Sequence, residues 1–275
     1  MLKEYFRLGR PVNALAGVSA VFVSAYAAGP PSWWPVIAAA LAVLLITVST
    51  NAWNDYLDIE IDRINKPGRP LPSGTISPKG ALIFSIVGSA LSLVLATFIN
   101  LPAFLIVLGS NLLLYLYSWK LKCTVLLGNV TVATIIGLCF VFGGVAAGAV
   151  SPTLMLAATV FMAMIGREIL KTMADYQGDF SQQCHTISTA LGKKTARLFM
   201  ILFMVLTAVL MLATYFTDQY KPVYLYLVVL CLFPVLTYIS VQTKSDTPAK
   251  HLEQMSTMMK YSFFIWFLAV VLGAS

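Results

Sequence analysis

Charged side chains are scarce in this sequence. Of its 275 residues, 11% are charged and 59% are hydrophobic, whereas soluble globular chains average about 25% charged and about 45–50% apolar residues. This shortage of charge excludes an ordinary soluble protein. It indicates a polytopic membrane protein, because a helix needs about 20 mostly apolar residues to cross a bilayer.

Histidine and cysteine are also sparse. His185 and His251 stand alone, without the spacing of metal ligands, which argues against a histidine-based metal site. The four cysteines show no paired spacing. Three of them, Cys123, Cys139 and Cys231, lie in or beside apolar stretches, and we interpret these three as small inert hydrophobic residues. No soluble segment combines a basic cluster with aromatic residues, and we therefore expect no nucleic-acid partner.

The sequence does contain nine apolar stretches of spanning length. They lie at residues 11–29, 34–57, 79–99, 102–118, 124–149, 153–174, 194–217, 222–242 and 258–274. Together they leave no room for a separate soluble domain. We predict an all-α fold with a single transmembrane domain over residues 1–275, in which nine helices surround a central lipid-accessible cavity. The first stretch is long and lacks a clear cleavage site, so we interpret it as a retained span rather than a signal peptide.

Charge is sorted to one side of the membrane. Every lysine and arginine except Lys221 falls on the side of the N-terminus, which the positive-inside rule makes cytoplasmic. We therefore expect a multi-pass protein of the cell membrane with a cytoplasmic N-terminus and an outside C-terminus. Every acidic residue except Asp218 falls on the cytoplasmic side too. Membrane topology depends on the basic residues and does not require acidic residues on the same side. The placement of the acidic residues therefore needs a separate explanation.

The first acidic segment, NAWNDYLDIEID at residues 51–62, closes the second apolar stretch. The polar residues that share about 100° of helical arc are Asn51, Asn54, Asp55, Asp58 and Asp62. Glu60 points away from this stripe. Carboxylates four residues apart repel each other and are unfavourable near hydrocarbon, so they need a counter-charge. Oxygen ligands without sulfur or imidazole suit a hard divalent cation, Mg²⁺ first.

A second acidic segment, REILKTMADYQGD at residues 167–179, closes the sixth stretch. Lys171, Asp175 and Asp179 recur every four residues, one turn after Arg167. The second and sixth spans emerge on the same side, which is consistent with a parallel internal repeat. Acidic residues at a helix end are often simply solvated. Two one-sided segments at the same side favour a functional site, and we expect it to be cytoplasmic.

Basic residues adjoin both acidic segments. In RINKPGRPLPSG, residues 63–74, prolines and glycines predict an ordered, turn-rich loop. Acids and bases around Mg²⁺ suit a diphosphate, because the metal bridges its oxygens while Arg and Lys take the remaining charge. An apolar interior open to lipid would suit a substrate with a long hydrocarbon tail. The candidate substrate-binding residues are Asn13, Asn51, Asp55, Arg63, Lys66, Arg69, Lys120, Lys122 and Lys171.

The sequence resembles the UbiA family of intramembrane prenyltransferases. That family has nine transmembrane helices and two acidic motifs, NDxxDxxxD and a KxxxDxxxD-like segment, which match residues 54–62 and 171–179 here. INKPGRPLPSG at residues 64–74 also resembles the family's loop.

The resemblance implies a transfer reaction at these motifs. Mg²⁺ held by Asn54, Asp58, Asp175 and Asp179 would bind the diphosphate of an allylic prenyl donor, and an acceptor would attack C1 of the prenyl chain. Asp62 would bind a second metal ion or act as a base toward the acceptor, and the sequence leaves this choice open. The expected catalytic residues are Asp58, Asp62, Asp175 and Asp179.

Three segments look most like the archaeal branch of that family: RLGRPVNALAG at 7–17, DRINKPGRPLPSG at 62–74 and REILK at 167–171. The branch joins a geranylgeranyl chain to geranylgeranylglyceryl phosphate in ether-lipid synthesis. Thr172 and Phe180 depart from its pattern, which has Asp and Arg at these places. An aromatic, quinone-precursor acceptor therefore remains an alternative.

Two other classes of membrane protein also carry acidic residues in or near their spans. A CDP-alcohol phosphotransferase, also a Mg²⁺ enzyme, would need an Asp-Gly and Ala-Arg pattern on the helix of its aspartates, and no such run occurs. A divalent-cation transporter would need acids near mid-membrane on several spans. Here the acids cluster at one face, which favours the prenyltransferase.

Overall fold

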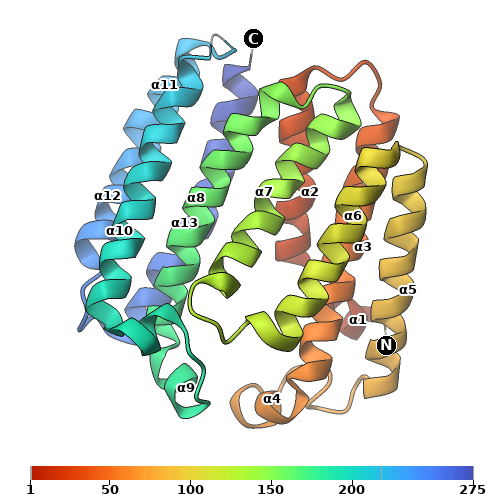
Figure 1. The fold of residues 1–275 in the computed structure, drawn as a ribbon, viewed down its shortest axis with the longest axis vertical. Helices are drawn as coiled ribbons and strands as arrows, with labels where there is room; N and C mark the ends of the chain where they lie inside the picture. Colours follow the sequence, from red (N-terminus) through yellow and green to blue (C-terminus); the bar gives the residue numbers. More distant parts are fainter. Residues whose placement is uncertain (1, 218, 275) are drawn as a thin grey trace. The chain divides into compact units, whose positions relative to one another are not determined.

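The computed structural model describes residues 2–217 and 219–274, apart from the side chains of Ile64 and Asn65. Asp218 therefore lies outside the described residues. Helices joined by short turns and loops make up most of the described chain (Figure 1). In chain order the helices are α1 (Leu2–Leu8), α2 (Pro11–Ala28), α3 (Trp34–Leu57), α4 (Ile59–Asn65), α5 (Pro78–Thr97), α6 (Leu101–Leu116), α7 (Leu127–Ala147), α8 (Ser151–Ala174), α9 (Tyr176–Ser181), α10 (Ile187–Tyr215), α11 (Pro222–Leu227), α12 (Phe233–Gln242) and α13 (Ala249–Gly273). Two π-helical turns, η1 (Tyr117–Leu121) and η2 (Val228–Leu232), extend α6 and join α11 to α12.

Nine helical segments of the described chain are long and apolar enough to cross a membrane, which confirms the predicted all-α class and its nine spans. The second span matches its prediction, Trp34–Leu57. Two helices begin earlier than predicted, at Ile187 and Ala249, because their first turns are polar and carry no hydropathy signal. In α10 the early part ends at Gly192, whose φ of 81° breaks the helix just before the predicted spanning segment.

The chain divides into two compact units, one formed by residues up to Lys120 with Val141–Val150 and the other by Leu121–Phe140 with the rest of the chain. Helix α7 contributes to both. In the first unit, a Cβ at Gly143 would lie only 2.5 Å from the carbonyl oxygen of Val21, so α7 approaches α2 closely there. The single domain and the central cavity expected from the sequence stay predictions.

In the first unit, α3 is the central helix and contacts α2, α5 and α6. Small side chains permit this close packing, as is typical of membrane helices. Ala39 and Ala42 are fully buried, and Gly17 of α2 faces Val43. Asn111 of α6 donates a hydrogen bond to Ser92 of α5 at 3.1 Å, which joins these two helices. Figure 1 shows α1 and α4 at the same end of α3.

In the second unit, α8 packs against α10 and α13. Phe140 of α7 lies 5.6 Å from Trp266 of α13 between ring centroids, and both side chains are fully buried. The buried Tyr224 hydroxyl donates to the Met211 carbonyl oxygen at 3.0 Å. These contacts fix the helices whose ends carry the second acidic segment, where α9 follows α8 (Figure 1).

Candidate functional site

The first acidic segment lies where α3 ends and α4 begins. The sequence predicted one helix through Asp62, but the chain bends at Asp58, whose φ of −91° and ψ of 8° end α3. The N–H groups of Asp58 and Asp62 still donate to carbonyl oxygens four residues earlier, at 3.0 and 2.8 Å. The polar stripe therefore continues across the bend.

The second acidic segment has the same local geometry. Helix α8 ends at Ala174, and Asp175 has a φ of −81° and a ψ of 4° before α9 begins. The N–H of Asp175 donates to the Lys171 carbonyl oxygen, and that of Asp179 to the Asp175 carbonyl oxygen, both at 2.9 Å. Each segment thus bends at the aspartate four residues before its last one, Asp58 or Asp175, which adds a structural likeness to the internal repeat suggested by the sequence.

The stripe on α3 and α4 separates into two kinds of residue. Asn54 and Asp58 are partly exposed, and the Asn54 amide donates to Asp58 Oδ2 at 2.8 Å. Asp55 and Asp62 are buried and form ion pairs with Arg69, whose Nη1 lies 3.2 Å from Asp55 Oδ1. The sequence predicted that the five residues share a face. It did not predict that two of the carboxylates are covered by an arginine.

Glu60 lies off this stripe, as predicted. Its side chain is 75% exposed and pairs with Arg63 at 2.8 Å, one turn along α4. Arg63 was a candidate substrate-binding residue. The structure places its guanidinium with Glu60 on the exposed face, away from the buried Asp62.

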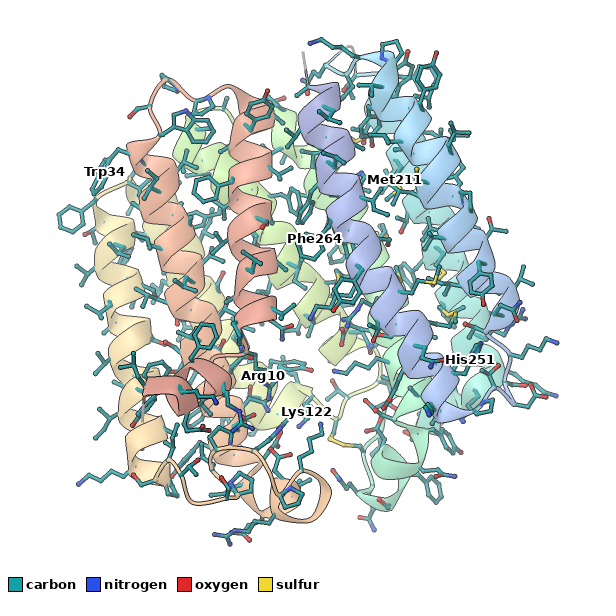
Figure 2. The ribbon with its side chains drawn as sticks, turned by 180° about the vertical axis from the view of Figure 1, so that it is seen from behind. Arg10, Trp34, Lys122, Met211, His251 and Phe264 are labelled. Atoms are coloured by element: carbon teal, nitrogen blue, oxygen red, sulfur yellow. A yellow bond between two sulfur atoms is a disulfide. The ribbon has the colours of Figure 1, made fainter. Side chains whose placement is uncertain are left out.

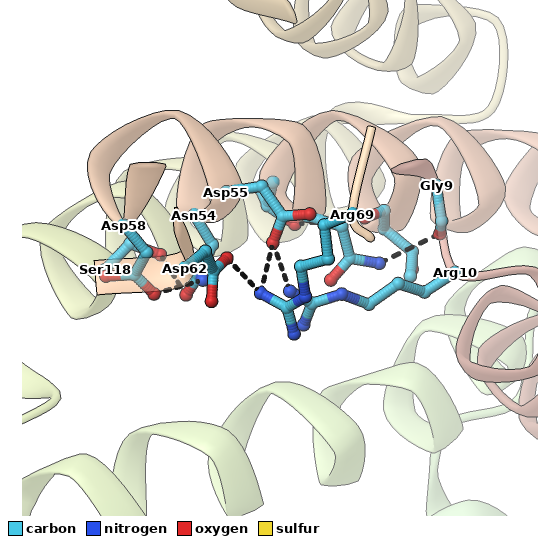
Figure 3. Close-up of polar contacts among 11 residues, drawn as sticks. Gly9, Arg10, Asn54, Asp55, Asp58, Asp62, Arg69 and Ser118 are labelled. Atoms are coloured by element: carbon cyan, nitrogen blue, oxygen red, sulfur yellow. Dashed lines mark hydrogen bonds and ion pairs between the residues drawn. The ribbon is translucent and has the colours of Figure 1, made fainter. Parts of the chain in front are cut away.

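Arg10, which the sequence counted only as a topology charge, lies against the first acidic segment. Its guanidinium forms an ion pair with Asp55 from the turn between α1 and α2 (Figure 3). Asn51 donates to the carbonyl oxygen of the adjacent Gly9 at 2.9 Å. The feature of the sequence that could have pointed to Arg10 is the Arg-Pro pair within RLGRPVNALAG. This pair does not specify which carboxylate forms an ion pair with the arginine.

The loop that carries Arg69 is ordered, as its prolines and glycines predicted. Leu71 and Ile76 are buried in a cluster with Leu8, which anchors the loop to α1 and α3. The carbonyl oxygen of Pro70 accepts hydrogen bonds from the Ile76 N–H at 3.1 Å and from the Thr75 hydroxyl at 3.0 Å. This anchoring fixes the position of Arg69.

In the second segment, Asp179 has an elevated pKa of about 6. Burial is the main cause, and the nearby Asp175 carboxylate raises the pKa further. The Thr186 hydroxyl and the charges of Lys171 and Lys122 act in the opposite direction. Asp175 is exposed and Asp179 is partly buried, and because the two carboxylates repel each other, added positive charge here would be stabilising.

The donor atoms fit the magnesium ion implied by the sequence. Asn54 and Asp58 in one segment, and Asp175 and Asp179 in the other, offer only oxygen ligands, which hard divalent cations prefer. Within the described part of the chain, no three His, Cys, Asp or Glu side chains gather into a metal-binding group. Neither segment provides a complete set of ligands, and the ligand roles, including that of Asp62, stay predictions.

The interpretation of the three cysteines in or beside apolar stretches as inert hydrophobic residues was wrong for Cys123. Cys123 and Cys184 form a disulfide, with 4.6 Å between their Cα atoms (Figure 2). They are 61 residues apart in sequence, so no local spacing could reveal the pairing. The Cys184 N–H donates to the Asp179 carbonyl oxygen at 2.8 Å. The bond therefore ties the segment that carries Lys122 to the end of the second acidic segment.

The remaining candidates are distributed over both units. Lys120 lies in the first unit, with Nζ 4.2 Å from the centre of the Trp119 ring. Asn13 and Lys66 are exposed in the same unit. In the second unit, Lys171 is exposed on the last turn of α8. Their roles toward a substrate stay predictions.

Comparison with known sequences gives matches over the whole chain. The model of the UbiA prenyltransferase family matches residues 14–268. Digeranylgeranylglyceryl phosphate synthase of Methanosphaera stadtmanae is 33% identical over 275 residues, which cover 99% of this chain and 100% of the relative. The enzyme of that name from Methanothermobacter thermautotrophicus is 32% identical, over 99% of this chain and 96% of its own length.

Comparison with solved structures gives the same fold. A structure of digeranylgeranylglyceryl phosphate synthase matches with a TM-score of 0.82 and 31% identity, over 99% of this chain and 98% of the other. A UbiA homologue from Archaeoglobus fulgidus, solved with GPP and Mg²⁺, matches with a TM-score of 0.78, over 98% of this chain and 99% of its own. At 22% identity, this second likeness concerns the fold alone.

Proposed function

Since this chain belongs to the UbiA family and is a multi-pass membrane prenyltransferase, we propose that it moves a geranylgeranyl group from its diphosphate to geranylgeranylglyceryl phosphate in a Mg²⁺-dependent reaction. The similarity to digeranylgeranylglyceryl phosphate synthases over 99% of the chain carries this proposal. The two acidic segments, bent at Asp58 and at Asp175, support the metal-dependent part.

Four oxygen-bearing side chains would hold the metal: Asn54, Asp58, Asp175 and Asp179. When bound, Mg²⁺ would neutralise the diphosphate oxygens as the bond from oxygen to C1 breaks. Positive side chains, including Lys171, would take the remaining charge of the leaving group. The apolar helices would exclude water from the electron-poor prenyl carbon, so that the acceptor hydroxyl attacks C1 as the C1–oxygen bond breaks and its proton passes to the released diphosphate.

The orientation is part of the proposal. The N-terminus and the site would face the cytoplasm and the C-terminus would lie outside, because the basic residues fall on one side of the spans. Reagents that label an introduced cysteine from outside the membrane should reach residue 274 and leave residue 3 unlabelled, in a variant whose own cysteines are replaced. The reverse pattern would show that the orientation is inverted.

An aromatic acceptor is the second candidate. It is favoured by the departures from the archaeal pattern at Thr172, which hydrogen-bonds Ser188 at 2.8 Å, and at Phe180, whose ring is stacked with that of Tyr176. Both residues have structural partners here. Transfer to an acceptor other than the glycerol phosphate would use the same prenyl donor, and the donor part of the reaction would be unchanged.

A single assay separates these acceptors. Purified protein in detergent is given geranylgeranyl diphosphate with either geranylgeranylglyceryl phosphate or a hydroxybenzoate, and the prenylated products are identified by mass spectrometry. We expect product from the glycerol phosphate only, loss of turnover with EDTA and its return with Mg²⁺. Product from the aromatic acceptor alone would refute the proposed acceptor. Turnover that is indifferent to chelation would refute the metal.

A further inference from the structure

We propose that Asp55 and Asp62 are positioning residues rather than metal ligands, and that they hold Arg10 and Arg69 together as a site for phosphate oxygens of a substrate head group. The proposal rests on the proposed function in that it requires a phosphorylated substrate. It adds Arg10 to the site and divides the first acidic segment into two parts with different tasks.

The first argument is the order of burial within these four residues. The side chains of Asp55 and Asp62 are 4% and 6% exposed, whereas those of Arg10 and Arg69 are 32% and 24% exposed. The carboxylates thus lie beneath the guanidinium groups. The exposed groups of this cluster are therefore the positively charged guanidinium N–H donors of the two arginines, which suit phosphate oxygens.

The second argument is that both arginines meet at one atom. Arg10 Nη2 and Arg69 Nη1 both donate to Asp55 Oδ1, and Arg69 also donates to Asp62 Oδ2 (Figure 3). Two guanidinium groups repel each other unless a negative charge lies between them. Asp55 supplies that charge, and the contacts leave most of the N–H groups of each fork for a second anion.

The third argument is the backbone of Arg10. Its φ of 51° and ψ of 71° lie in the left-handed region, which is uncommon for residues other than glycine. The ion pair with Asp55 and the hydrogen bond from Asn51 to the Gly9 carbonyl oxygen hold this turn against α3. Residues held in such conformations cluster at functional sites.

The fourth argument concerns the metal. A cation bound to Asp55 or Asp62 would have to displace an arginine from a buried carboxylate. Asn54 and Asp58 are partly exposed and are hydrogen-bonded to each other, so they are the members of the segment that a hydrated Mg²⁺ would reach. The arginine pair should therefore bind an anion without metal.

The experiment measures anion binding in the absence of metal. Thermal unfolding of the detergent-purified protein is followed in EDTA with inorganic pyrophosphate, and with sodium chloride at equal ionic strength as the blank. We expect pyrophosphate to raise the unfolding midpoint of the wild type and of Asp58→Asn, but not of Arg10→Gln or Asp55→Asn. Arg10→Lys, which keeps the charge but not the fork, should retain part of the shift.

Steady-state kinetics then identifies which substrate carries the phosphate. Loss of one charge-assisted hydrogen bond should raise KM by about tenfold in Arg10→Gln, with kcat and the Mg²⁺ requirement much less affected. A rise for geranylgeranyl diphosphate assigns the arginines to the donor, and a rise for the acceptor assigns them to its phosphate. If Asp55→Asn does not fold, the comparison of Arg10→Gln with Asp58→Asn in the pyrophosphate measurement carries the test.

The proposal is overturned if Arg10→Gln keeps the full pyrophosphate shift, or if Asp58→Asn loses it as Asp55→Asn does. It is also overturned if Asp62→Asn shifts the Mg²⁺ dependence as strongly as Asp58→Asn. The pyrophosphate measurement needs no acceptor and no turnover. A wrong acceptor would therefore leave the shift intact, and failure of the proposed function can be told apart from failure of this inference.

Discussion

Replacement of Arg69 by glutamine tests whether the ion pairs of the first unit stabilise the protein. Arg69 joins two buried carboxylates, Asp55 and Asp62, and holds the loop after α4 near α3. Glutamine is long enough to fill the space but carries no charge. The substitution would leave Asp62 without the arginine that pairs with it, while Asp55 would keep Arg10.

The expected loss follows from the burial of the partners. Removal of one partner of a buried ion pair is destabilising by about 3–5 kcal/mol. Arg69 is 24% exposed, so water screens part of the interaction, and we expect about 2–3 kcal/mol. For a chain of this size, the unfolding midpoint should fall by about 5–10 °C.

The matched control is Arg63→Gln, six positions before Arg69. Arg63 pairs with Glu60, but the two side chains are 55% and 75% exposed, and such surface pairs contribute about 0–1 kcal/mol. Thermal unfolding in detergent, followed by tryptophan fluorescence, compares the two variants. The Arg69→Gln/Asp62→Asn double variant should recover part of the loss because it leaves no unpaired carboxylate at position 62.

Equal decreases in the two single variants would refute this reasoning, since they would show that burial does not distinguish the pairs. A double variant that is less stable than Arg69→Gln would also contradict it. In that case the carboxylate of Asp62 would have another stabilising partner, and the ion pairs seen here would not set the stability of the loop.

Other measurements test the remaining conclusions. Asp175→Asn should lower turnover by at least about 100-fold without changing the unfolding midpoint. Glu60→Gln should keep turnover near that of the wild type, because the Glu60 side chain lies off the polar stripe. A strong loss of turnover in Glu60→Gln would show that the functional face of the helix is misassigned. Alkylation of the unreduced, denatured chain should label only the two free cysteines, Cys139 and Cys231. Cys184→Ser should reduce the free energy of unfolding by about 2–4 kcal/mol. Four labelled cysteines would disprove the disulfide. Gly143→Ala should destabilise the protein, because the added Cβ would lie 2.5 Å from the Val21 carbonyl oxygen. Gly109→Ala, where the added Cβ meets open space, should leave the stability unchanged. Equal losses of stability in the two variants would contradict the close approach of α7 and α2.

Features that depend on local pattern were predictable from the sequence. The spans follow from runs of apolar residues, because transfer of each residue into lipid adds to the total independently of the partner helices. The face shared by Asn54, Asp55, Asp58 and Asp62 follows from the helical repeat, as does the outward direction of Glu60. The ordered loop follows from its prolines and glycines, which restrict the backbone within a few residues.

Helix ends were less predictable, because they depend on single backbone angles. The bends at Asp58 and Asp175 and the break at Gly192 do not interrupt the hydrophobic pattern, and apolar periodicity therefore continued through them. The polar first turns of α10 and α13 were missed for the opposite reason, since they are helical without being apolar.

Only the tertiary structure decided which distant groups meet. Arg10 and Asp55 are 45 positions apart, and Cys123 and Cys184 are 61 apart. Their contacts arise because α1 packs at the end of α3, and because the segment after η1 reaches the end of α9. The sequence specifies how each residue behaves among its neighbours along the chain. The pairing of an arginine with one aspartate rather than another depends on how whole helices pack, which no local pattern encodes.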